Sequence, residues 1–391
     1  MASGYFVDSL CQPRKPRRLV LLDKQFGMLS KAEDADRYFF TLSTFAEYPD
    51  LWTSNSDFSD MKKLSDANPR QKDFRWGKAE LVRWVDGDGR KMKGVLVKPD
   101  GFDPSRKYPM LVYFYERLSQ NLHRYVTPQP GTSPNASYYV SNGYLFLMPD
   151  IRYEIGHPGA SCVKCVVSGV QSLIEKGFVD PARIGAAGHS WGGYQTAFLA
   201  THTSIFAAIE SGAPVSNMIS AYGGIRYGTG VSRQFQYEMT QSRIGGTPWE
   251  FPMRYWENSP IFFVDQVTTP ILILHNDRDG AVPWTQGIEF FTALRRLGKE
   301  SYLLDYVGED HGLRKRQNQR DWTRRMAEFF DCYLKSAPMP KWMSEGVPYE
   351  DREREKIPFA PSYRELHESR AGAEEPEAAG ATAGAAPKGR G

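Results

Sequence analysis

Apolar runs alternate with helical patterns through the middle and C-terminal parts of the chain. The apolar runs predict buried strands at 110–115, 144–149, 183–188, 206–211, 271–275 and 301–307. Segments with a helical pattern at about 160–175, 192–202, 286–297 and 316–335 predict helices. Because strands that alternate with helices build a parallel sheet covered on both faces, the pattern predicts an α/β fold with a mostly parallel sheet.

The first 75 residues follow a different pattern. RRLVLLD, DRYFFTLSTF and PDLWTSN are strand-like pieces separated by turn formers, too few to bury a core alone. Residues 79–99 predict a hairpin, with Asp-Gly turn chemistry at 86–89. We therefore expect an all-β part over 1–75, an α/β domain over 76–345, and an extended, largely disordered tail over 346–391.

Composition and charge argue against several classes of function. The chain has 391 residues, 41% of them hydrophobic, and a formal net charge of +3. This mild charge does not favour nucleic acid or an anionic membrane as a partner. No apolar run approaches the roughly 18 residues of a membrane span, and no export signal is visible. Localisation stays open, since the N-terminus of a longer protein could carry such a signal.

The cysteines give little evidence for metal or redox chemistry. Cys162 and Cys165 form a single C-x-x-C within a predicted helix, and no second pair or paired histidines complete a zinc set. We interpret them as buried packing residues. We expect neither a metal nor an organic cofactor.

The stretch GHSWGG at 188–193 raises the first question of chemistry. It surrounds Ser190 with Gly188, Gly192 and Gly193 directly after a predicted strand. One interpretation is a tight strand-to-helix turn that happens to contain a serine. The other is a nucleophile elbow, in which the glycines permit a strained turn that exposes the hydroxyl above a sheet.

An acid and a histidine follow Ser190 in the chain order of α/β-hydrolases. Asp277 and Asp279 lie in the loop after the strand at 271–275, and His311 follows the next strand. Since functional side chains gather at the C-terminal ends of such strands, these loops are expected to converge. His311 is then the general base, and Asp279 or Asp277 is the acid that orients it. A helix N-cap is the alternative role for Asp279.

A hydrolytic site also needs donors for an oxyanion. The backbone N–H of Trp191, which directly follows Ser190, is the first candidate. Tyr113 and Tyr115, at the end of an early strand, are candidates for the second, although a tyrosine at a strand end often only packs.

Four segments in order resemble the prolyl oligopeptidase family of serine peptidases, most of all its dipeptidyl-peptidase and acylaminoacyl-peptidase branches. They are KYPMLVYFY at 107–115, GHSWGGY at 188–194, HNDRDGAVP at 275–283 and EDHGLRKR at 309–316. The resemblance implies an α/β-hydrolase domain joined to a β-propeller, with Asp279 as the acid and Tyr115 as the tyrosine donor. It also makes residues 1–75 similar to the last blade or so of that propeller, most of which is then missing.

The resemblance further implies a substrate pocket. Residues 211–224 are similar to the family region that lines the pocket before the scissile bond. This places Val215, Met218 and Tyr222 near Val282, an apolar lining that suits proline, alanine or another modest side chain. The aromatic box of strict post-proline enzymes is not matched, so a proline requirement is not implied.

The chain departs from the family pattern beside the donor tyrosine. Glu116, Arg117 and Leu118 stand where the family has glycines, and Asn276 replaces another glycine. Glu116 is either an anchor for the amine of a substrate or, as the simpler alternative, the partner of Arg117 or Arg152 in a surface ion pair.

The function predicted from these residues is a serine-type peptidase that hydrolyses short peptides through an acyl-enzyme. A general esterase on the same triad is the first alternative. An inactive interaction module is the second, because open strand edges near the N-terminus favour pairing, for example with another copy of the chain.

Overall fold

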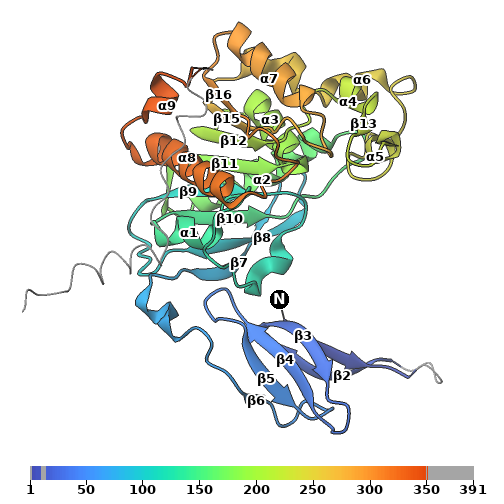
Figure 1. Cartoon of the computed structure of the whole chain (residues 1–391), viewed down its shortest axis with the longest axis vertical. Coiled ribbons are helices and arrows are strands. Elements are labelled where there is room, and N and C mark those ends of the chain that lie inside the picture. Colours follow the sequence, from blue (N-terminus) through green and yellow to red (C-terminus); the bar gives the residue numbers. More distant parts are fainter. Residues whose placement is uncertain (1, 10–14, 349, 351–391) are drawn as a thin grey trace, which may run out of the picture. The chain divides into compact units, whose positions relative to one another are not determined.

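An eight-stranded mixed sheet forms the centre of the computed structural model, which describes residues 2–9, 15–348 and 350 (Figure 1). Across the sheet the strand order is β16-β15-β12-β11-β9-β10-β8-β7. The strands are β7 (Lys78–Val85), β8 (Lys91–Lys98), β9 (Tyr108–Tyr113), β10 (Leu145–Pro149), β11 (Val179–His189), β12 (Ala208–Gly212), β15 (Ile271–Leu274) and β16 (Ser301–Leu304). The six strands from β16 to β10 run parallel, whereas β8 and β7 form the expected antiparallel hairpin. The predicted α/β fold is confirmed.

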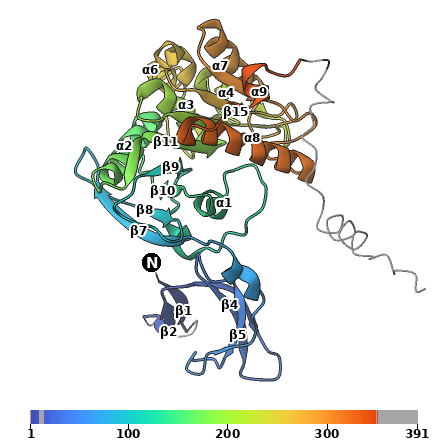
Figure 2. The ribbon, with the colours of Figure 1, turned by 90° about the vertical axis from the view of Figure 1, so that its left-hand side faces the viewer.

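Alternate residues of each strand face opposite sides of the sheet and bury two separate cores. Met110 and Val112 belong to the core that contains residues of α2 (Pro158–Ile174), α3 (Trp191–His202) and α7 (Thr285–Arg296). Leu111, between them, belongs to the core with α1 (Ala136–Ser141) and α8 (Arg316–Lys335). Figure 2 shows α2 and α8 on opposite sides of the strands. With both faces covered, these strands read as continuous apolar runs in the sequence.

Two small antiparallel sheets form the N-terminal part. β1 (Ser3–Val7) pairs with β2 (Arg17–Leu22), and β3 (Gln25–Lys31), β4 (Tyr38–Ser43), β5 (Asp50–Ser54) and β6 (Lys62–Lys63) form a four-stranded sheet. Val20, Phe40, Leu42 and Phe58 form their core. Four antiparallel strands are the number in one propeller blade, and the identity of this part as a propeller remnant stays a prediction.

The chain between β12 and β15 folds into short elements that the sequence pattern did not predict. They are α4 (Met218–Tyr222), β13 (Ile225–Arg226), β14 (Val231–Ser232), α5 (Gln234–Glu238), α6 (Pro252–Glu257) and the 3₁₀ helix η3 (Pro260–Gln266). The remaining short helices are η1 (Pro69–Asp73), η2 (Ser119–His123) and α9 (Lys341–Ser344). Most of the predicted tail lies outside the described residues. No helix in the described part of the chain is long and apolar enough to cross a bilayer.

Candidate active site

Ser190 occupies a strained turn between β11 and α3. Its φ of 63° and ψ of −116° lie in a region that costs a non-glycine residue about 1–3 kcal/mol. The turn is held from both sides, because Ser190 N donates to Gly212 O at 2.8 Å and Tyr194 N donates to Ser190 O at 3.0 Å. This is the geometry of a nucleophile elbow rather than of an ordinary loop.

Close backbone contacts explain the glycines around Ser190. A Cβ at Gly188 would lie 2.4 Å from Gly192 O, and a Cβ at Gly193 would lie 2.0 Å from Gly212 O. At Gly192 it would lie 2.6 Å from Phe114 O, at the end of β9. No side chain fits at these distances, so the three glycines allow strand, turn and helix to pack this closely.

The acid and the histidine are in direct contact. His311 Nδ1 lies 2.8 Å from Asp279 Oδ2, and Asp279 is only 2% exposed. The other carboxylate oxygen accepts from the N–H groups of Ala281 and Val282, each at 2.8 Å. His275 Nε2 lies 3.4 Å from Oδ2. Burial alone raises the pKa of Asp279, but the contacts with His275 and His311 outweigh it and hold the pKa well below its usual range.

The contact with Asp279 determines which ring nitrogen of His311 carries the proton. An ionised carboxylate only accepts, so Nδ1 of His311 carries the proton and Nε2 presents a lone pair. The His311 ring lies 4.8 Å from the ring of His189, the residue before Ser190. Burial, followed by the proximity of His311, lowers the pKa of His189 to about 3, which keeps His189 uncharged. Ser190 Oγ has no hydrogen-bond partner within the described part of the chain.

Asp277, the rival acid, lies against a different segment. Its Oδ1 accepts from Gly308 N at 2.7 Å, in the loop after β16, and its own N–H donates to Asp305. Nor does Asp279 cap a helix, because α7 begins at Thr285 with Trp284 at the N-cap. The geometry thus pairs His311 with Asp279 and leaves Asp277 as a loop-fixing residue.

Tyr115 lies beside the elbow, and a hydrogen bond from Gln241 holds its hydroxyl in place. The hydroxyl oxygen accepts from Gln241 Nε2 at 2.8 Å, which leaves the phenolic proton available for another acceptor. The ring is 3.8 Å from where a Cβ would stand at Gly192. The N–H of Trp191 opens α3 and has no acceptor within the helix. Both predicted oxyanion donors therefore lie at the elbow. Tyr113 instead donates its hydroxyl to Ser133 Oγ at 3.1 Å.

A second tyrosine, which sequence reasoning missed, holds this part of the site together. Tyr153 donates its hydroxyl to Tyr115 O at 3.1 Å and accepts from Trp191 Nε1 at 3.0 Å. It thereby links the loop after β9 to the first turn of α3. Its only sequence signal was its position shortly after the strand at 144–149.

The four predicted pocket residues meet in one buried cluster. Val215, Met218, Tyr222 and Val282 are each at most 5% exposed. The cluster also contains Trp191, Tyr194, Tyr237, Ile244 and Tyr255. Tyr237 and Tyr255 come from the unpredicted segment between β12 and β15, where the density of aromatic residues was the only sign. Burial and a hydrogen bond to Glu238 raise the pKa of Tyr222 to about 12.

The ion pair expected for Glu116 has a different partner. Arg243 Nη1 lies 3.0 Å from Glu116 Oε1, so the prediction of Arg117 or Arg152 is wrong. Arg243 also lies over the Tyr153 ring, 4.5 Å from its centroid. The cation–π contact and the ion pair together hold this guanidinium beside Glu116.

The cysteines of the C-x-x-C are buried and not disulfide-bonded. Burial raises the pKa of both Cys162 and Cys165, which disfavours the reactive thiolate. In the part of the chain that the structure describes, no group of three or more His, Cys, Asp or Glu side chains is placed to hold a metal ion.

Comparisons with known proteins identify a family and a fold. The profile described as "Prolyl oligopeptidase family" matches residues 130–337. Dipeptidyl-peptidase 5 of Porphyromonas endodontalis is 27% identical over 276 residues, which are 65% of this chain and 37% of that protein. The uncharacterized peptidase YuxL of Bacillus subtilis is 24% identical over 81% of this chain and 48% of its own length. The chain thus spans less than half of these relatives.

Solved structures show the same fold. The acylaminoacyl peptidase of Pyrococcus horikoshii superposes with a TM-score of 0.67 at 21% identity, over 83% of this chain and 52% of that one. A putative dipeptidyl aminopeptidase IV from Bacteroides ovatus gives 0.65 at 21% identity, over 80% and 44%. At these identities the likeness concerns the fold.

Proposed function

Since this chain belongs to the prolyl oligopeptidase family, we propose that it is a serine peptidase that hydrolyses short peptides with Ser190, His311 and Asp279. One observation carries the proposal: the serine of the strained elbow directly follows His189, whose ring centroid lies 4.8 Å from that of His311, and a buried carboxylate contacts the Nδ1 of His311. The relatives named as peptidases support the substrate class.

The proposed reaction runs through an acyl-enzyme. His311 Nε2 takes the proton of Ser190 as Oγ attacks the peptide carbonyl carbon, and Asp279 stabilises the imidazolium that forms. The N–H of Trp191 and the hydroxyl of Tyr115 donate to the oxyanion. His311 then protonates the leaving amine as the C–N bond breaks. Water, deprotonated by His311, hydrolyses the ester on Ser190.

The buried apolar cluster is proposed to receive the side chain before the scissile bond. Val215, Met218 and Val282 offer only carbon or sulfur there, and the Tyr222 hydroxyl is already bonded to Glu238. A small or medium apolar side chain such as alanine or proline suits this lining, whereas a charged one loses its hydration without a partner.

Substitution Ser190→Ala tests the function. We expect kcat/KM for alanine- and proline-containing peptide p-nitroanilides to fall by about 10⁴-fold or more, because the nucleophile is lost. Ser204→Ala, at an exposed serine after α3, is the matched control and should behave as the parent. Equal hydrolysis by the parent and Ser190→Ala contradicts the proposal. Turnover of p-nitrophenyl esters without any peptide turnover supports the esterase alternative instead.

Substitution Tyr115→Phe tests the oxyanion donor. Loss of one donor is expected to lower kcat by about 10²-fold with little change in KM. Tyr113→Phe removes a hydroxyl that bonds Ser133 and should leave kcat nearly unchanged. If the two variants have the same kcat, Tyr115 is not the donor.

A further inference from the structure

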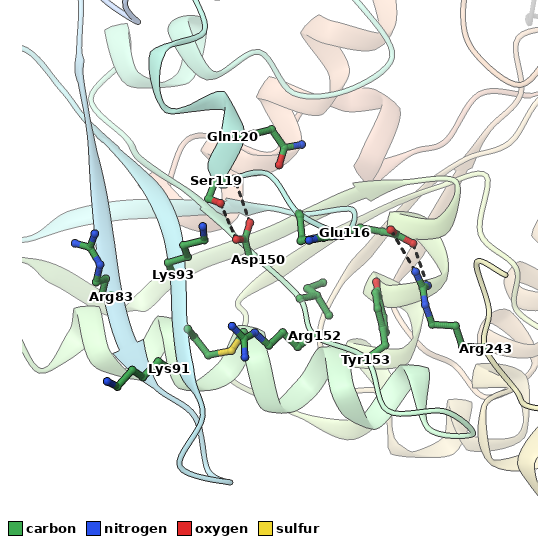
Figure 3. A pocket seen from close by; sticks show the side chains of 13 residues that line it. Arg83, Lys91, Lys93, Glu116, Ser119, Gln120, Asp150, Arg152, Tyr153 and Arg243 are labelled. Carbon is green, nitrogen blue, oxygen red and sulfur yellow. Dashed lines mark hydrogen bonds and ion pairs between the residues drawn. The ribbon is translucent and has the colours of Figure 1, made fainter. Parts of the chain in front are cut away.

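A cavity of about 850 Å³, with six basic side chains among the 13 residues that line it, opens next to the candidate active site (Figure 3). Its volume lies within the range of about 300–1,000 Å³ that is typical of ligand pockets. Six basic residues line it, namely Arg83, Lys91, Lys93, Arg117, Arg152 and Arg243, against the two carboxylates of Glu116 and Asp150. The lining therefore has a formal excess of four positive charges at neutral pH, although the whole chain has only +3.

The two carboxylates are occupied by contacts that fix the fold. Asp150 is 5% exposed and accepts from the N–H groups of Leu118 and Ser119 at 2.8 Å and from the Ser119 hydroxyl at 2.7 Å. Glu116 pairs with Arg243. Asp150 thus holds the start of η2, and Glu116 neutralises one guanidinium at one end of the cavity.

The remaining cations come from separate segments and converge on one space. Arg83 lies on β7, Lys91 on β8 and Arg152 in the loop after β10. Figure 3 shows Arg83, Lys91 and Lys93 at one end of the cavity, Tyr153 and Arg243 at the other, and Arg152 between them. Like charges in a concave, partly enclosed space repel one another and focus a positive potential, which favours a negatively charged occupant.

The cavity shares a wall with the proposed oxyanion site. Tyr153 lines the cavity and bonds both Tyr115 O and the indole of Trp191. Glu116, also in the lining, directly follows Tyr115. A peptide with its scissile bond at Ser190 therefore has the cavity beside it, within the reach of residues a few positions from that bond.

We propose that this cavity binds the carboxylates of acidic peptide substrates, through aspartate or glutamate side chains a few residues from the scissile bond. The inference rests on the proposed peptidase function. Arginine guanidinium groups pair with carboxylates in a two-pronged geometry, and besides Arg243 the lining offers such groups from three segments, at Arg83, Arg117 and Arg152. Basic residues from several segments around a space of about 850 Å³ suit several carboxylates along a peptide better than one small ion.

Binding to the full-length Ser190→Ala protein tests this inference without any turnover. Two fluorescein-labelled peptides of equal length carry either glutamates or glutamines at the same positions, and anisotropy is measured at low salt. We expect the glutamate peptide to bind about 10-fold more tightly or better, with the difference shrinking as salt rises to about 0.5 M. Arg83→Gln/Lys91→Gln/Arg152→Gln should remove the difference.

A matched variant separates a local effect from the net charge. The control is the triple variant Arg295→Gln/Arg296→Gln/Lys62→Gln. It removes as many positive charges as the cavity variant, from exposed positions outside the cavity lining, and it should retain the preference for glutamate. The inference is overturned if the parent binds both peptides equally, or if the cavity variant keeps the preference. Inorganic phosphate that saturates the protein without any glutamate preference also overturns it, in favour of a small-anion site.

The two proposals can fail separately. Hydrolysis of an uncharged peptide that depends on Ser190, together with equal binding of the two labelled peptides, contradicts the acidic subsite and leaves the peptidase. A glutamate preference in binding, together with the absence of Ser190-dependent hydrolysis of any peptide, contradicts the peptidase and leaves the acidic subsite.

Discussion

Two buried carboxylates near the C-terminal ends of the central strands have pKa values that are shifted in opposite directions. Asp279 follows β15 and is 2% exposed, whereas Glu210 lies within β12 and is 1% exposed. The pKa of Asp279 is held well below its usual range, and burial raises the pKa of Glu210 well above its own. Both side chains are almost fully shielded from solvent, so their different hydrogen bonds and charged neighbours help to explain the opposite directions.

The number of hydrogen-bond donors around each carboxylate helps to explain why the two pKa shifts differ in direction. Asp279 accepts from two backbone N–H groups and from His311, with His275 nearby. Glu210 accepts only from Gly188 N, at 3.2 Å, and its Oε1 has no partner among the described residues. Desolvation thus dominates at Glu210, whereas at Asp279 the hydrogen bonds and charges of His275 and His311 together outweigh it. Asp279 is thus favoured as a carboxylate at the His311 imidazole, whereas burial disfavours the charged form of Glu210.

The largest predicted effect follows from neutralising Asp279. Asp279→Asn cannot stabilise an imidazolium and favours the wrong tautomer of His311, so kcat/KM for a peptide p-nitroanilide should fall by about 10⁴-fold. Asp277→Asn, two residues away, is the matched control and should change it by no more than about three-fold. A larger loss in Asp277→Asn than in Asp279→Asn reverses the assignment of the acid.

Glu210→Gln should change how stability depends on pH. The folded pKa of Glu210 is raised, so the stability it contributes is complete below about pH 4.5 and is lost as the pH rises toward that folded pKa. Glutamine does not titrate. The unfolding free energy of the variant minus that of the parent should therefore increase by about 1.4 kcal/mol per pH unit above about pH 5.

Urea denaturation of both proteins between about pH 5 and pH 7 measures this difference. The contribution of His189, whose own pKa is lowered, opposes that of Glu210 in the same range but is common to both proteins and cancels. A difference that stays constant with pH shows that Glu210 is ionised in the fold, and the contrast with Asp279 is then wrong.

His275→Asn is predicted to have the smallest of the three effects. It removes one contact from Asp279 Oδ2, at 3.4 Å, and leaves the bond to His311, so kcat should fall by about 10-fold with KM little changed. The downfield proton resonance of His311 Nδ1–H should shift in the variant, which a purely structural role of His275 would not cause. His202→Asn, on α3 against Phe198, is the control for loss of a packed imidazole.

Long elements and strand ends were predictable from the sequence. Each strand of the parallel sheet and the helices α2, α3, α7 and α8 follow from apolar runs and helical periodicity, since burial on the sheet faces dictates those patterns. Ser190 and His311 could be selected as candidates because motif residues follow those strands. The choice between Asp279 and Asp277 needed the family resemblance, because both stand in one loop.

The parts of the fold and of the site that the sequence did not predict depend on contacts between residues that are distant in the chain. The short helices of the segment between β12 and β15 are held by bonds such as Ser216 Oγ to Gln286 O and Tyr255 OH to Gly246 O, which leave no periodic signal. Arg243, the partner of Glu116, lies 127 residues away in the chain. The sequence does not distinguish Glu210 from other polar strand residues, and only its buried surroundings show that its pKa is raised.

Covalent labelling by a peptidyl diphenyl phosphonate, followed by mass spectrometry, tests the central claim most directly. If the Asp279–His311 pair activates Ser190, the adduct lies on Ser190, and Asp279→Asn slows its formation by about 10³-fold or more. An adduct on another residue, or equally fast labelling of Asp279→Asn, contradicts the account.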